Sequence, residues 1–367
     1  MTSEEIIWKF PQVSLLNDRH SNIFPILNSD TWRKNTSQLS FVLGFDVLGN
    51  PAVGDLGGLQ NLLITGKEET GKSSLVSTIL TTLLLNNSPV SLKLVILDSS
   101  RTDLTRFNKI PHLLSPVITD AEKGISALRW TLAEIDRRYK LLSQSGAKNI
   151  EGYNEMSGFQ ALPYIALFID DLTEMYQFSP VEYEDALVRI FQFGKRAGIY
   201  TVSSALKATK AIISGIQSRI SFSSDETTIL APNDFLLTQN RDTFPLCIQS
   251  PILSDVGINN VLTFIKDQGV VYEPTAEVTS TPKLKVPGLS GEIDDLFEDA
   301  IRIVCQYDRA SAALIQRRLS IGYARSARII DQLEAAKVIS ASDGSSKPRN
   351  VLVQDAELFI GQYKNGK

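Results

Sequence analysis

The chain has 367 residues, 43% of them hydrophobic, and a formal net charge of −4. This length supports one large domain and a small one, and the acidic balance argues against a chain that coats nucleic acid over its whole surface. Two cysteines (Cys247, Cys305) and two histidines (His20, His112) are too few for a disulfide framework or a zinc cluster, and they fit a reducing, intracellular setting.

The N-terminal segment, residues 1–40, is weakly patterned. Its first residues are acidic and lack the basic start and apolar core of a signal peptide. Apolar runs in the chain stay shorter than 18 residues. We therefore expect no membrane-spanning segment and a cytoplasmic protein.

From about residue 41 to 273, apolar strand-like runs alternate with helical stretches. Strands separated by helices are typical of a parallel sheet covered on both faces. We therefore predict an α/β domain with a mostly parallel sheet over residues 41–273. The strand candidates are 62–65, 92–97, 164–169, 200–204, 219–222 and 246–248, and a long helix is expected within 120–143.

A phosphate-binding motif follows the first of these strands. Residues Gly66–Ser73 match G-x-x-x-x-G-K-[ST], between the apolar run and a helix-prone stretch. Such a loop surrounds phosphate oxygens with backbone N–H groups, and the helix dipole adds to the attraction. Lys72 would reach the β- and γ-phosphates of ATP, and Ser73 would hold Mg²⁺. The predicted nucleotide contacts are Gly66, Lys67, Glu68, Glu69, Thr70, Gly71, Lys72, Ser73 and Ser74.

Two of these loop residues are carboxylates. Glu68 and Glu69 would repel phosphate if they point inward, and they would cost little if they point to solvent. The sequence leaves both orientations open.

A second candidate site lies at the end of another strand. The apolar stretch 162–169 ends in Asp170 and Asp171. This pair follows the phosphate loop by about a hundred residues, a spacing that favours a functional role. The first carboxylate would then orient Mg²⁺, and the second would polarise the attacking water. Taken alone, the same pattern describes a buried strand that ends in a polar turn. Asp98 also ends a strand and would add a polar group at the same sheet edge.

The C-terminal part has a different organisation. Residues 274–293 are rich in Pro, Gly, Ser and Thr, which indicates a linker. Helical segments follow at 294–307, 311–319 and 322–336, and a turn-rich piece at 343–349 separates apolar residues 338–339 from 351–353. Three helices and a hairpin in this order predict a winged helix-turn-helix domain over 294–355, followed by a tail at 356–367.

Positive charge is concentrated in this C-terminal part. Residues 309–349 carry eight basic side chains against three acidic ones, which favours contacts with DNA phosphates. Residues 322–336 would form the recognition helix, and arginine suits guanine in the major groove. A solvated basic face on a small helical bundle is the alternative. The predicted DNA contacts are Arg317, Arg318, Ala324, Arg325, Arg328, Lys347 and Arg349.

Several segments together resemble the FtsK/SpoIIIE family of ring-forming DNA translocases. The resemblance covers residues 41–353 and includes both domains in the same order. It is carried by Leu43–Asp46 with Asp55–Leu56, Ile110–Leu114 with Val117–Asp120, Ala127–Tyr139, Gly152–Asn154, Ala197–Ile199, and Ile315–Tyr323 with Ala327–Glu334.

The resemblance implies a RecA-like motor. Such motors hydrolyse ATP between the subunits of a hexameric ring, pump double-stranded DNA through its channel, and read short DNA sequences with the C-terminal domain. It implies that Asp170 serves the metal and that Asp171 stands where the family has a catalytic glutamate. Lys195, Arg196 and Arg219 are candidates for a cation that acts across a subunit boundary.

This sequence also departs from the family pattern. Asp171 is one methylene shorter than glutamate, Leu206 replaces a glutamine that would sense the γ-phosphate, and Ala324 stands where asparagine is frequent. The lobe that precedes the ATPase core in family motors is not recognisable in residues 1–40. The leading hypothesis is an ATP-dependent DNA translocase. The alternatives are a nucleotide-binding DNA-binding protein without useful hydrolysis, and a related ATPase that moves protein cargo.

Overall fold

The computed structural model describes residues 8–18, 20–67, 70–99, 103–172, 176, 179–206, 210–222, 230–231, 233–239, 245–279, 294, 296–307, 309–319, 321–341, 348–353, 355–356 and 359–360. The chain divides into two compact units, Met1–Ser280 and Thr281–Lys367.

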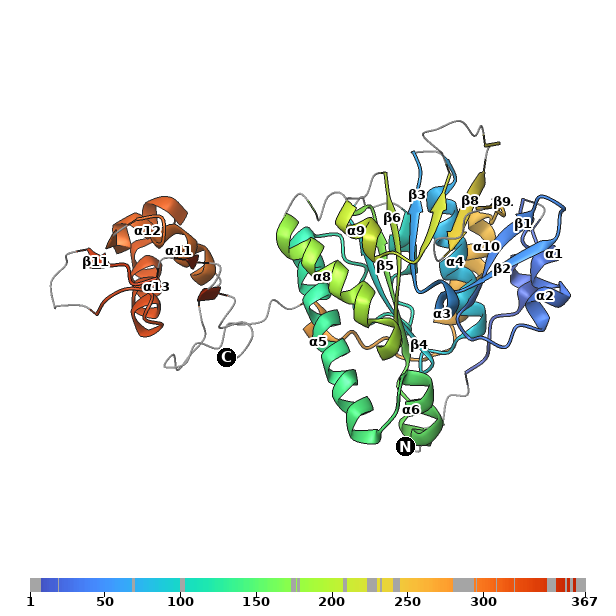
Figure 1. The fold of residues 1–367 in the computed structure, drawn as a ribbon, viewed down its shortest axis with the longest axis horizontal. Coiled ribbons are helices and arrows are strands. Elements are labelled where there is room, and N and C mark those ends of the chain that lie inside the picture. Colours follow the sequence, from blue (N-terminus) through green and yellow to red (C-terminus); the bar gives the residue numbers. More distant parts are fainter. Residues whose placement is uncertain are drawn as a thin grey trace. The chain divides into compact units, whose positions relative to one another are not determined.

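A nine-stranded sheet forms the centre of the first unit, counted over the described residues, in the order β2-β1-β9-β8-β7-β3-β6-β5-β4 (Figure 1). The five strands from β7 to β4 run parallel, and the remaining four continue the sheet in antiparallel pairing. The strands are β1 (Ser40–Asp46), β2 (Pro51–Asp55), β3 (Asn61–Thr65), β4 (Leu92–Asp98), β5 (Tyr164–Asp170), β6 (Ile199–Ala205), β7 (Ser218–Ser221), β8 (Asp234–Gln239) and β9 (Leu246–Gln249).

Helices cover both faces of this sheet, because its parallel strands are apolar on both sides (Figure 1). Leu62 and Ile64 of β3 enter the core with α4 and α10, whereas Leu63 enters the core with α5 and α8. The helices are α1 (Phe24–Leu27), α2 (Asp30–Arg33), α3 (Leu56–Leu59), α4 (Lys72–Asn86), α5 (Ala121–Ser145), α6 (Ile150–Ser157), α8 (Pro180–Phe193), α9 (Lys210–Gly215) and α10 (Asp255–Lys266). Short 3-10 turns are η1 (Val13–Leu16), η2 (Asp103–Phe107), η3 (Gly158–Gln160), η4 (Lys195–Ala197) and η5 (Ala276–Val278).

The α/β class predicted from the sequence is confirmed, and each predicted strand is present. The long helix α5 begins after Asp120, whose side chain caps it by accepting a hydrogen bond from the Lys123 N–H. The antiparallel strands β1, β2 and β8 had not been predicted individually. Residues before β1 do not stand apart from the domain, since Leu16, Ile23 and Ile26 are fully buried in the core that contains α4.

His112 lies inside the first unit as a packed loop residue. It is fully buried, its Nε2 lies 3.0 Å from the Asn87 carbonyl oxygen, and its ring meets Trp8 edge-on. Burial lowers the pKa of His112 to about 4. The imidazole is therefore neutral at physiological pH and has a structural role.

In the described part of the second unit, three helices pack with a small two-stranded sheet. The helices are α11 (Phe297–Val304), α12 (Ala312–Leu319) and α13 (Tyr323–Ala335), and β10 (Arg309–Ala310) pairs antiparallel with β11 (Arg349–Asn350). Ile339 bridges to Val351 beside them. These elements enclose a separate core that includes Phe297, Ile315 and Leu333, which matches the helix and strand order of a winged helix. Among the described residues of both units, none of the helices has the length and apolar character needed to cross a membrane.

Candidate nucleotide site and DNA-reading surface

The phosphate loop connects β3 to α4 at the carboxyl edge of the parallel strands. At two positions of this loop, neighbouring atoms leave too little space for a side chain. A Cβ at Gly66 would lie 2.7 Å from the Thr70 hydroxyl and 2.9 Å from Phe222. Gly71 has φ +98°, and a Cβ there would lie 2.9 Å from the Asn233 side chain. At both of these positions the backbone is therefore closely surrounded, as contact between backbone and phosphate demands.

The start of α4 is available to an anion. Lys72 is its first residue and the glycine before it has no side chain with which to cap the helix. The loop is also stabilised from within, because the Thr70 hydroxyl donates to the Lys67 carbonyl oxygen over 2.8 Å. Ser73 is partly buried and Ser74 exposed at this end of the helix, and Glu68 and Glu69 lie outside the described residues.

Polar side chains line the same edge on neighbouring strands. Asp98 at the end of β4 is in register with Asp170 at the end of β5, and both are buried, with exposed fractions of 0% and 5%. The Ser204 hydroxyl of β6 donates to Asp170 Oδ1 over 2.5 Å. Next to it, the Thr65 hydroxyl lies 3.1 Å from the Ser221 hydroxyl. Oxygen ligands of this kind suit Mg²⁺.

Asp171 has an unusual backbone. Its φ is +58°, in the left-handed region that asparagine and aspartate adopt more readily than other side chains. Its N–H donates to the Ser204 hydroxyl over 3.1 Å. Ser204 thus joins both acidic residues, a role that sequence reasoning missed even though a serine at a strand end beside two aspartates was a usable signal.

Two further residues border this edge. Tyr183 of α8 is fully buried, and burial, together with the charge of Asp171, raises its pKa. Among the described residues its hydroxyl has no hydrogen-bond partner. Leu206 follows β6 and is 54% exposed, so an apolar side chain faces solvent beside the candidate nucleotide site.

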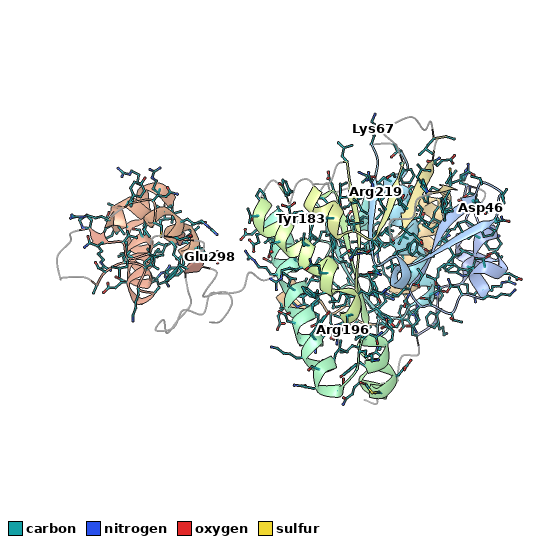
Figure 2. The ribbon with its side chains drawn as sticks, viewed as in Figure 1. Asp46, Lys67, Tyr183, Arg196, Arg219 and Glu298 are labelled. Atoms are coloured by element: carbon teal, nitrogen blue, oxygen red, sulfur yellow. The ribbon has the colours of Figure 1, made fainter. Side chains whose placement is uncertain are left out.

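The candidate cations for a neighbouring subunit lie at different places on the first unit. Lys195 and Arg196 belong to η4, and Figure 2 shows Arg196 at the end of the domain opposite Lys67. Arg196 Nε donates to the Lys148 carbonyl over 2.6 Å, and its guanidinium lies 5.2 Å from the Tyr139 ring centre. Arg219 is exposed on β7.

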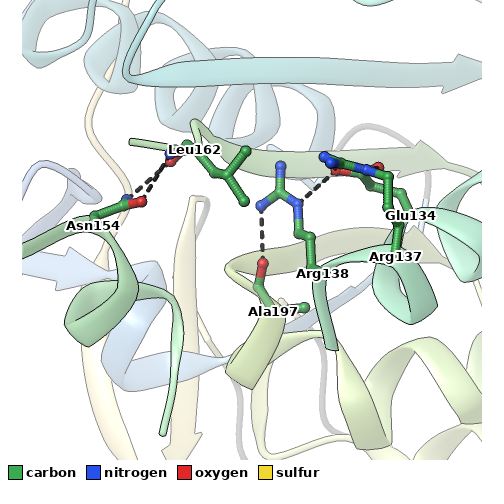
Figure 3. A network of polar contacts seen from close by, with 6 residues as sticks. All are labelled: Glu134, Arg137, Arg138, Asn154, Leu162 and Ala197. Atoms are coloured by element: carbon green, nitrogen blue, oxygen red, sulfur yellow. Dashed lines mark hydrogen bonds and ion pairs between the residues drawn. The ribbon is translucent and has the colours of Figure 1, made fainter. Parts of the chain in front are cut away.

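A buried arginine supports the turn that carries Lys195 and Arg196 (Figure 3). Arg138 has 1% of its surface exposed, and it donates to the Ala197 carbonyl over 2.8 Å and to Glu134 over 2.7 Å. Burial disfavours the charge on Glu134, but hydrogen bonds from Arg137 and Arg138 outweigh it and lower the pKa of this carboxyl. The hydrogen bond from Arg138 therefore fixes the turn to α5, and the ion pair with Glu134 holds the Arg138 side chain in place.

In the second unit, most of the predicted DNA-contact arginines have protein partners. Arg325 and Arg328 both donate to Asp294, at distances between 2.8 and 3.1 Å. Hydrogen bonds from Arg325, with a smaller contribution from Arg328, hold the pKa of Asp294 below its ordinary value. Arg349 pairs with Glu334 at 2.5 Å. It therefore fastens β11, the strand of the predicted wing, to α13.

The remaining predicted contacts are more open. Arg318 packs over the Tyr307 ring and also donates to its hydroxyl. Arg317 and Ala324 are exposed, and Arg317 has no ion pair among the described residues. Lys347 lies outside the described residues. Sequence reasoning missed Asp294, because nothing in its local pattern marked it as the partner of a helix some thirty residues away.

Comparisons with known proteins agree with this arrangement. The model of the FtsK/SpoIIIE family matches residues 22–211, and that of the FtsK gamma domain matches residues 291–354. A DNA translocase FtsK from Clostridium acetobutylicum is 34% identical over 355 residues, which cover 91% of this chain and 46% of that protein. The chain thus spans about half the length of the curated relatives it matches.

Solved structures with a similar fold are more distant in sequence. EssC (ATPases 2 and 3) from Geobacillus thermodenitrificans has a TM-score of 0.56 at 17% identity, covering 75% of this chain and 55% of that one. The pCW3 conjugation coupling protein TcpA, solved with ATPγS, has a TM-score of 0.54 at 20% identity, covering 64% of this chain and 73% of that one. These likenesses show the ATPase fold of the first unit.

Proposed function

Because this chain belongs to the FtsK/SpoIIIE family, we propose that it is an ATP-driven motor that moves double-stranded DNA. The observation that carries the proposal is the combination of two units in one chain. The first has a phosphate loop beside a row of buried carboxylates, and the second is a winged helix with arginines on its recognition helix. In such a motor the first unit would hydrolyse ATP and the second unit would read the sequence of the DNA.

The chemistry of the donor set fits ATP with Mg²⁺. Gly66 and Gly71 leave room that any Cβ would fill, and the start of α4 offers N–H donors to phosphate. Lys72 would bind the β- and γ-phosphates, and Ser73 and Asp170 would hold the metal. When bound, Mg²⁺ would neutralise charge that develops on the phosphate oxygens.

Asp171 would accept a proton from the attacking water. Its carboxylate is set by the left-handed backbone and by the N–H bond to Ser204, which also orients Asp170. One hydroxyl would therefore couple the position of the base to that of the metal ligand. A base fixed in this way would lose little orientation, which matters because a side chain one methylene shorter than glutamate tolerates little misplacement.

The same proposal extends to the assembly. Arg196 lies far from Lys67 in Figure 2, so in a hexameric ring the turn η4, which carries Lys195 and Arg196, would be presented to a neighbouring subunit rather than to its own nucleotide. Arg219 on β7 is the other candidate. We place the motor in the cytoplasm, where ATP and chromosomal or plasmid DNA are both present.

Leu206 favours a second candidate function. An exposed leucine beside the site cannot form a hydrogen bond with a γ-phosphate. A protein that binds ATP and DNA but hydrolyses ATP slowly would retain the glycine loop and the winged helix and would tolerate this leucine.

A DNA-stimulated ATPase assay separates the two. We expect linear duplex DNA to stimulate turnover by the full chain, and Lys72→Ala to reduce this turnover about 10²–10³-fold, the effect of removing one preorganised donor. Lys34→Ala, an exposed lysine paired only with the neighbouring Asp30 in the described chain, is the matched control. ATP binding without DNA-stimulated turnover would instead support the second candidate.

A further inference from the structure

Asp294 of the second unit contacts two arginines of α13. Its side chain is 3% exposed. Arg325 approaches it with Nε and Nη2, at 2.9 and 2.8 Å, and Arg328 approaches with Nη2 at 3.1 Å. The two arginines come from the same helix, three positions apart, so a single carboxylate holds both guanidinium groups.

Hydrogen bonds also hold the side chain and the backbone of Asp294 in place. Asp294 Oδ1 accepts a hydrogen bond from the Leu296 N–H over 3.1 Å, and the Asp294 N–H donates to Gln332 Oε1 over 3.1 Å. Gln332 lies on α13, the helix that carries the arginines. Asp294 therefore has a fixed position relative to α13 before any DNA arrives.

Both arginines remain accessible while they are held. The Arg325 side chain is 41% exposed and the Arg328 side chain 65% exposed. Arginine presents its donors in a rigid plane, so fixing one edge of the guanidinium also fixes the direction of the other. Groups that are already oriented lose less conformational freedom on binding and discriminate better between partners.

The carboxylate also has an electrostatic effect. It places a negative charge next to two cations on the surface that would approach DNA, which weakens attraction to phosphates of any sequence. Base contacts depend on geometry, whereas phosphate contacts depend mainly on charge.

We propose that Asp294 is a positioning residue for sequence reading: it orients Arg325 and Arg328 toward base edges and reduces sequence-independent binding to DNA. This inference rests on the proposed function of the second unit as a DNA reader. A residue outside the recognition helix α13 would thus contribute to the sequence preference.

The test uses the full chain and a pool of randomised duplex DNA. We expect the wild-type protein to enrich particular sequences. The measured ratio is the affinity for an enriched sequence divided by the affinity for scrambled duplex. Asp294→Asn should reduce this ratio on the order of tenfold, the size of one lost bidentate base contact. Binding of Asp294→Asn to scrambled duplex should be equal or tighter at low salt. Asp294→Glu keeps the charge but moves it, so it should reduce the ratio without tightening scrambled binding.

Asp299→Asn is the matched control, because Asp299 pairs with Arg302 on the exposed surface of α11. It should leave the ratio unchanged, and circular dichroism should report the same fold for all variants. If Asp294→Asn and Asp294→Glu retain the wild-type ratio, the inference is wrong while the DNA reader stands. If the wild-type chain enriches no sequence, the proposed reading function fails and the inference fails with it.

Discussion

Asp170 in the first unit and Asp294 in the second are both aspartates whose side chains have little exposed surface, but the two side chains are held in different ways. Asp170 accepts a hydrogen bond from Ser204, a neutral hydroxyl. Asp294 accepts from two guanidinium groups. The Ser204 contact orients Asp170 without cancelling its charge, whereas the two guanidinium contacts oppose the charge of Asp294 directly.

This difference separates a carboxylate suited to an incoming cation from one that organises its own domain. The first kind belongs where a metal is to be bound, and the second where cationic side chains must be kept in one arrangement. Substitutions at the two places should therefore fail differently. Around Asp170 the loss should appear in chemistry, and around Asp294 in selectivity and salt dependence.

The largest effect is expected from Asp171→Asn. Asparagine adopts the left-handed backbone as readily as aspartate and keeps the N–H donor to Ser204, so the fold should be preserved. The charge that would take a proton from water is lost, and general-base catalysis contributes about 10²–10⁴-fold. Steady-state ATPase rates should fall by that factor, while calorimetric ATP binding stays within a few-fold. Unchanged turnover would remove Asp171 from the mechanism.

Ser204→Ala tests the neutral donor directly. It leaves the Asp171 N–H and the buried Asp170 carboxylate each without one partner, which costs about 1–3 kcal/mol of unfolding free energy. We expect a lower urea midpoint and a higher Mg²⁺ concentration for half-maximal ATPase activity.

Ser203→Ala is the control for this change. Ser203 is equally buried, but its hydroxyl donates to the Leu62 carbonyl over 3.3 Å and takes no part in the acidic edge. It should lower stability by a similar or smaller amount and leave the Mg²⁺ requirement unchanged. Equal Mg²⁺ requirements for both variants would show that Ser204 does not orient the metal ligand.

The parallel half of the sheet could be predicted from the sequence because its strands are short, apolar runs separated by long helices. The positions of the phosphate loop after β3 and of Asp170 at the end of β5 could be predicted because the motifs that mark them are continuous in sequence. β1 and β2 were not identified as strands, since glycines at 44 and 54 and a proline at 51 interrupt their patterns.

The partners of the site residues could not be predicted in the same way. Ser204 meets Asp170 only because β6 lies beside β5 in the sheet, an order that the sequence does not state. Asp294 meets Arg325 only after α11 and α13 pack together. The basic composition of the second unit indicated DNA binding, but it did not reveal which arginines would be engaged by carboxylates.

The smallest effect is expected from Arg317→Ala, and the comparison with Arg349→Ala makes it informative. Arg317 is exposed on α12, whereas the Arg349 side chain is 18% exposed and paired with Glu334 and Asp331. An arginine that contacts phosphate contributes about one unit to the slope of log affinity against log salt, without regard to sequence. Arg317→Ala should therefore reduce that slope by about one, with unchanged thermal stability.

Arg349→Ala should lower the melting temperature because it separates the wing from α13. A reversed outcome, with stability lost at Arg317 and the salt slope lost at Arg349, would mean that ion pairing within the unit does not decide which of its arginines meet DNA.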